Sequence, residues 1–123
     1  MPTPLLLSRM DGWGMEEKLH SIYKRLVDIS AAYLIYQDRH NIELIKDQLP
    51  QIQEFVLWFM ESNRLEIEAS LYADMCSNLI FILKDILTAL EQGDRVLMHD
   101  AVANGIMEYL DFFIEPKEKS GYE

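Results

Sequence analysis

Apolar side chains recur at steps of three and four residues from residue 16 to about residue 39. They are Leu19, Ile22, Leu26, Ile29, Tyr33 and Tyr36. Steps of three and four place side chains on one face of an α-helix, so this spacing predicts a helix over 16–39. Acidic residues open the segment and basic residues close it, which is the order that the helix dipole favours.

A second segment, over about 41–61, repeats this spacing. Its apolar positions are Ile45, Leu49, Ile52, Val56 and Phe59. Asn41 is expected to cap the start of this helix. Pro50 lies inside the segment and cannot donate a hydrogen bond to the carbonyl of Lys46, so we expect a kink near Pro50 or a break there.

Two further helices are predicted in the second half of the chain. Asn63 and Glu66 have the spacing of a capping box, which predicts a third helix over about 64–92. Gly93 is placed to end that helix, and Asp94 to cap a fourth helix over about 95–114, which Pro116 closes. Their apolar stripes are Tyr72, Cys76, Leu79, Leu83, Ile86 and Leu90, then Met98, Val102, Ile106, Tyr109 and Phe113.

The first 15 residues carry Pro2, Pro4, Gly12 and Gly14, which predict an irregular N-terminal arm. The chain then divides into the arm over 1–15, a four-helix bundle over 16–115 and a flexible tail over 116–123. No segment has the alternation of a strand. Short connections favour antiparallel neighbours, so the predicted fold is all-α, an up-down four-helix bundle.

The net charge of the chain makes some classes of binding partner unsuitable. Eleven Lys and Arg stand against 21 Asp and Glu, a formal net charge of −10. An acidic surface repels phosphate backbones and anionic lipid headgroups, so we expect no nucleic acid and no membrane as partner. The apolar runs are far too short to span a bilayer, and the single cysteine, Cys76, cannot form an internal disulfide. We expect a cytoplasmic protein.

Three apolar runs exceed what one helix face can bury. They occupy residues 31–36, 55–60 and 79–83, and each covers the full circumference of a helix. They either contact neighbouring helices on two sides or form a second apolar face for a partner. We favour the second interpretation, which predicts a homodimer or a protein partner. The candidate interface residues are Phe55, Trp58, Phe59, Ile80 and Phe81.

No residue pattern predicts a catalytic site, a cofactor site or a metal site. Glu17 and His20 have the Glu-x-x-His spacing of di-iron bundles, but a second such pair is missing. Arg95 and His99 share a helix face. This pair is similar to that of the HEPN ribonucleases, although Val96 replaces the polar residue usual in that family. An RNA-cleaving enzyme, or a small-ligand binder with a cavity among the tyrosines of the first helix, is therefore the alternative.

Residues 49–52 and 57–58, and residues 85–94 followed by Val96, Leu97 and Asp100, carry a resemblance to a known family. They resemble a family of short helical proteins of clostridia and related Firmicutes, classed as a domain of unknown function. The resemblance covers residues 42–113. It implies a helical fold and a bacterial cytoplasmic origin, and no activity. The prediction from the whole chain is a non-catalytic protein-interaction module that binds a partner or itself through apolar helix faces.

Overall fold

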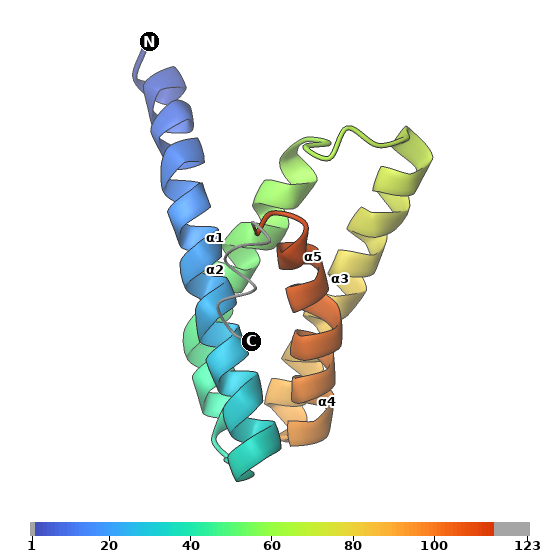
Figure 1. Ribbon diagram of the computed structural model, residues 1–123. Helices are drawn as coiled ribbons and strands as arrows, with labels where there is room; N and C mark the ends of the chain where they lie inside the picture. Colours follow the sequence, from blue (N-terminus) through green and yellow to red (C-terminus); the bar gives the residue numbers. More distant parts are fainter. Residues whose placement is uncertain (1, 115–123) are drawn as a thin grey trace.

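The computed structural model describes the backbone of residues 2–114 and the side chains of residues 14–114. Residues 2–114 form four helical segments, which we call legs, and contain no strand. The first three legs are α1 (Pro2–Tyr36), α2 (Asn41–Glu61) and α3 (Ala69–Gln92). The fourth leg comprises α4 (Arg95–Ala101), a π-helix η1 (Val102–Ile106) and α5 (Met107–Asp111). Every element of the described residues is helical, so the all-α prediction is confirmed. Successive legs run in opposite directions (Figure 1).

The expected irregular arm over 1–15 is wrong for the described residues, because α1 already begins at Pro2. Both prolines fall in the first turn, where backbone N–H groups have no helical partner, so their missing donors cost nothing there. Gly12 and Gly14 each weaken a helix by only about 1 kcal/mol relative to alanine. The arm therefore continues the first helix.

Pro50 does not break the second leg, and α2 continues through it from Asn41 to Glu61. The proline is exposed, whereas Ile45, Ile52 and Val56 of the predicted stripe are buried. A carbonyl that loses its helical donor on an exposed face is open to water. This placement explains why the helix tolerates the proline.

The third leg begins at Ala69, five residues later than predicted. Glu66 has a φ of 54°, which lies in the left-handed region and is incompatible with a helix at that point. The side chain of Asn63 instead bridges the connection. Its Oδ1 accepts from the Ile67 N–H at 3.2 Å, and its Nδ2 donates to the Ile67 carbonyl at 2.6 Å. Asn63 therefore stabilises the loop between α2 and α3 and does not form the expected capping box.

The predicted stop and start at residues 93 and 94 are confirmed. Gly93 adopts a φ of 65°, and the Asp94 N–H returns to the Ala89 carbonyl at 3.0 Å, as at many helix C-termini. The Asp94 side chain accepts from the Leu97 N–H at 3.0 Å and so caps α4. One residue ends a helix and the next begins another.

The fourth leg departs from a plain α-helix, which the sequence pattern did not predict. Its middle turn, Val102–Ile106, is a π-helix, and helical structure ends at Asp111 rather than at residue 114. Gly105 lies in this turn and is buried against α3. A Cβ built on it would stand 2.9 Å from Cγ2 of Ile82. The absence of a side chain permits this close approach. Pro116 and the tail over 116–123 lie outside the described residues.

One core runs the length of the bundle and draws on every leg. The first helix buries its predicted stripe only as far as Ile29; Tyr33 is half-buried and Tyr36 is 79% exposed. The fully buried large side chains are Phe55, Leu26, Ile45, Ile52, Leu79, Ile86, Met98, Ile106, Leu110 and Val102. Met15, Leu19, Ile22 and Ile29 of α1 are also buried, at 3–6% exposed, so all four legs build the core.

We expect Gly105→Ala to destabilise the protein by about 1–3 kcal/mol, the usual cost of overpacking a core. Chemical denaturation would measure the free energy of unfolding. Gly14→Ala is the matched control, since a Cβ there meets nothing within 4 Å and alanine favours a helix. In an Ile82→Ala background the added methyl should cost much less. An equal cost in both backgrounds would contradict the proposed contact.

Candidate functional site

Two of the five predicted interface residues belong to the core. Phe55 is 1% exposed and Phe59 is 2% exposed, so their placement on an outer surface is wrong. The ring centroid of Phe59 lies 5.7 Å from that of Tyr72 on α3 and 5.6 Å from that of Tyr109 on α5. The face of α2 that carries these rings packs against two legs at once. The aromatic run is therefore explained by the first of the two sequence interpretations.

Trp58 is half-buried at the edge of this aromatic cluster. Its ring lies edge-on to Phe113, with centroids 5.0 Å apart. The Arg64 guanidinium covers it at 4.2 Å from the ring centroid, and Arg64 Nε donates to the Trp58 carbonyl at 3.2 Å. Much of the indole surface is thus occupied within the chain.

Ile80 and Phe81 remain exposed, at 38% and 63%. Ile80 belongs to a second apolar stripe along α3, beside the buried one. We call it the outer α3 stripe; it comprises Cys76, Ile80, Leu83, Leu87 and Leu90, at alternating steps of four and three. Leu87 is 42% exposed, whereas Cys76, Leu83 and Leu90 are half-buried and pack against the core. A stripe with this spacing can receive another helix.

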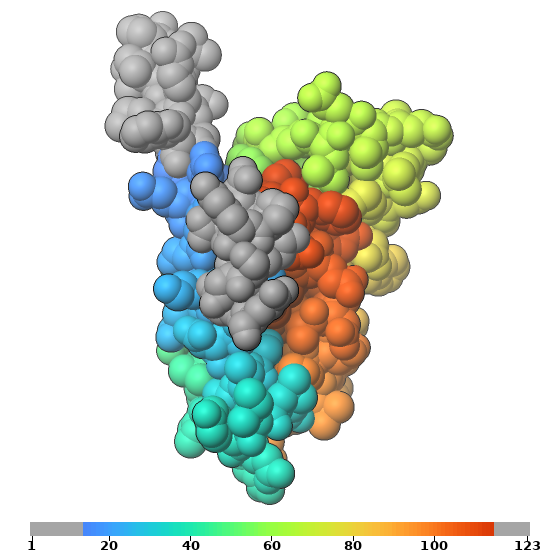
Figure 2. Space-filling model, viewed as in Figure 1, coloured from blue at the N-terminus to red at the C-terminus, as the bar shows by residue number. Residues whose placement is uncertain are grey.

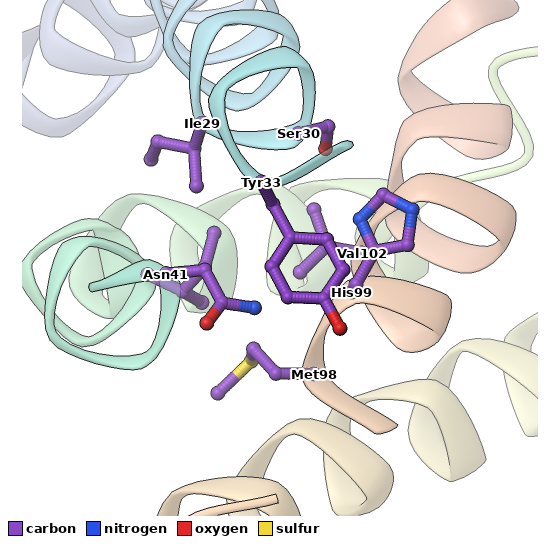
Figure 3. A pocket seen from close by; sticks show the side chains of 8 residues that line it. Ile29, Ser30, Tyr33, Asn41, Met98, His99 and Val102 are labelled. Carbon is purple, nitrogen blue, oxygen red and sulfur yellow. The ribbon is translucent and has the colours of Figure 1, made fainter. Parts of the chain in front are cut away.

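Figure 3 shows Tyr33, Asn41 and His99 where α1, α2 and α4 meet. His99 of α4 stacks on the ring of Tyr33 from α1, with centroids 4.8 Å apart and an interplanar angle of 23°. Arg95 is the first residue of α4 and is exposed. The structure therefore brings Arg95, His99 and one tyrosine of the first helix to the same region.

Asn41 is a site residue that the sequence interpretation placed wrongly. It is the first residue of α2 rather than its cap, and it is 3% exposed. Its Nδ2 donates to the Arg95 carbonyl at 3.1 Å, which ties the start of α2 to the start of α4. Its buried Oδ1 has no hydrogen-bond partner among the described residues. A signal was present, because Asn41 extends the stripe of Ile45 and Leu49 by one step of four.

A depression of about 340 Å³ opens at this end of the bundle. Tyr33, Leu34, Gln37, Arg39 and Arg95 line it. We call it the end depression. The first three come from the end of α1 and the residue that follows it, while Arg39 belongs to the connection and Arg95 to α4. In the space-filling view this end of α1 lies beside the early part of the fourth leg (Figure 2).

The part of the chain that the structure describes can be compared with the patterns of a metal site and of a membrane-spanning helix. Within it, no group of three or more His, Cys, Asp or Glu residues could hold a metal ion. None of its helices is both long and apolar enough to cross a membrane. Among the described residues, Glu17 and His20 lack the further acidic and histidine neighbours that a di-iron site needs.

We expect Trp58→Ala to lower the free energy of unfolding by about 2–3 kcal/mol, below the cost for a fully buried tryptophan. The ring contacts with Phe113 and Arg64 would be lost. Thermal or chemical denaturation followed by circular dichroism would measure the change. Stability within about 0.5 kcal/mol of the parent, the range of ordinary surface substitutions, would show that the contacts contribute little.

Asn41→Asp should be more harmful at neutral pH than in acid. Burial raises the pKa of a carboxyl group above about 4, its ordinary value, and only the protonated form can donate to the Arg95 carbonyl. A group with a raised folded-state pKa contributes fully below its unfolded pKa and loses that contribution as the pH rises. Denaturation at several pH values should therefore show a deficit that grows from acid to neutral pH, whereas Asn41→Ala should show a constant one.

Comparison with models of protein families, with curated proteins and with solved structures finds no match to this chain. The resemblance to the helical Firmicutes family therefore stays a prediction. The geometry of the chain itself is what any functional proposal has to rest on.

Proposed function

We propose that this chain is a non-catalytic protein-interaction module that binds a second copy of itself, or another protein, through the outer face of α3. The observation that carries the proposal is the exposure of Ile80, Phe81 and Leu87 on one helix. Single exposed apolar residues are ordinary on protein surfaces. A regular stripe beside the core is less ordinary, because it repeats the spacing of a helix-packing surface.

The second leg also exposes apolar side chains. Leu57 is 68% exposed and Met60 is 37% exposed, although Phe55 and Phe59 in the same run are buried. α2 packs directly against α3. Like α3, α2 therefore carries exposed apolar side chains.

A second copy of the chain is the binding partner for the outer face of α3 that requires no other protein. A two-fold dimer presents the same patch from both subunits and is the commonest form of self-association. The charge of −10 on each subunit opposes this association at low ionic strength. Apolar contact has to overcome that repulsion, so the association should be measured at moderate salt.

The double substitution Ile80→Glu and Phe81→Glu should abolish self-association while the fold is retained. Both side chains are exposed, and two added carboxylates would repel their counterparts in a symmetric interface. Sedimentation velocity across micromolar concentrations would report the mass, and circular dichroism would report the helical content.

Ser21→Glu combined with Gln51→Glu is the control, since it adds the same charge at exposed positions on α1 and α2, away from α3. Its sedimentation should match the parent. A parent protein that sediments as a 14.4 kDa monomer at every concentration would exclude the homodimer. In that case a protein partner from the native cytosol, recovered by the parent and not by the double variant, would be the remaining form of the proposal.

A further inference from the structure

The end depression gathers two arginines without any opposing charge. Arg39 and Arg95 both line it, and within the described residues neither guanidinium forms an ion pair or a side-chain hydrogen bond. The chain has only 11 basic residues against 21 acidic ones. Two unpaired arginines facing one depression therefore stand out against an acidic background.

The acidic residues next to them in the chain are engaged elsewhere. Asp38 accepts from the His40 backbone N–H at 3.0 Å and from its ring Nδ1 at 2.8 Å. These contacts, the backbone bond first, lower the pKa of Asp38. Asp94 caps α4 through the Leu97 N–H. Neither carboxylate is used to neutralise the depression.

The position of Arg95 is fixed by the core rather than by the surface. Its carbonyl accepts the hydrogen bond from buried Asn41, which lies two residues after Arg39. The backbone segments that carry the two arginines are thus joined by a buried contact. Tyr33, on the wall of the same depression, is held by its stack with His99.

The remaining wall is apolar or neutral. Leu34 is 64% exposed, and Tyr33 presents an aromatic ring beside it. The amide of Gln37 can donate or accept a hydrogen bond. A volume of about 340 Å³ suits a small organic molecule and is too small for a helix of another protein.

We propose that the end depression is a binding site for a small organic anion, with a carboxylate or phosphate group attached to an apolar group. The planar fork of each guanidinium matches the oxygens of such groups and can bind them with paired hydrogen bonds. Leu34 and Tyr33 would cover the apolar part. This site is separate from the outer α3 stripe and does not depend on the proposed self-association.

Nuclear magnetic resonance of the full chain labelled with nitrogen-15 would test the site. The probes are phenyl phosphate, phenylacetate, inorganic phosphate and benzyl alcohol. We expect saturable shifts of the Arg39 and Arg95 Nε–Hε signals with the two aromatic anions, weaker binding of inorganic phosphate, and none of benzyl alcohol. The comparison of phenyl phosphate with phenylacetate tells which anionic group is preferred. Shifts that never saturate, or that spread over all basic residues, would overturn the proposal.

Arg39→Gln combined with Arg95→Gln should weaken binding of the better probe by about tenfold or more, as expected for loss of charge-assisted hydrogen bonds. The matched control is Lys24→Gln combined with Arg25→Gln, which removes the same charge from exposed positions on α1. Its affinity should stay within about twofold of the parent, since distant exposed charges are screened by salt. Equal weakening by both variants would show general attraction to positive charge and would overturn the site.

Discussion

The packing of the fourth leg on α3 depends on the missing side chain of Gly105. The leg approaches so closely that a methyl group there would meet Ile82 at 2.9 Å, well inside ordinary contact distance. The π-helical turn over Val102–Ile106 surrounds this glycine. A π turn adds a residue to one helical turn and so shifts the register of the side chains that follow. That shift lets Val102, Ile106 and Leu110 all reach the core although their steps are uniformly four.

A single buried polar contact organises the other end. Asn41 lies in line with the apolar stripe of α2, where that stripe meets the first turn of α4. Its side-chain amide donates a hydrogen bond to the Arg95 carbonyl. Burying an amide without all of its partners costs free energy, and in the part of the chain that the structure describes its Oδ1 has none. Such a cost is retained where a residue fixes the relative position of two elements. Here the contact joins the start of α2, two residues after Arg39, to Arg95 at the start of α4.

The sequence predicted the element types well because apolar spacing and cap residues act locally. Most of the predicted stripe is buried in the first, second and fourth helices, and the junction at Gly93 and Asp94 is as predicted. In the third helix only Leu79 and Ile86 of the predicted stripe are buried. The failures came from tertiary contacts. The face on which Phe55 and Phe59 lie is decided by Tyr72, Tyr109 and Phe113 from other legs, and a pattern within α2 cannot show that a second leg covers it.

The candidate sites were less predictable for the same reason. Ile80 and Phe81 were found because an apolar run around the full circumference of a helix leaves some members outside. The end depression combines residues separated by up to 62 positions, Tyr33 and Arg95, and only the fold brings them together. Within the described residues its two arginines form no ion pair. Asp38 and Asp94, the acidic residues next to them in the chain, accept backbone hydrogen bonds from His40 and Leu97. These carboxylates thus serve as turn and cap residues rather than as ion-pair partners of the arginines.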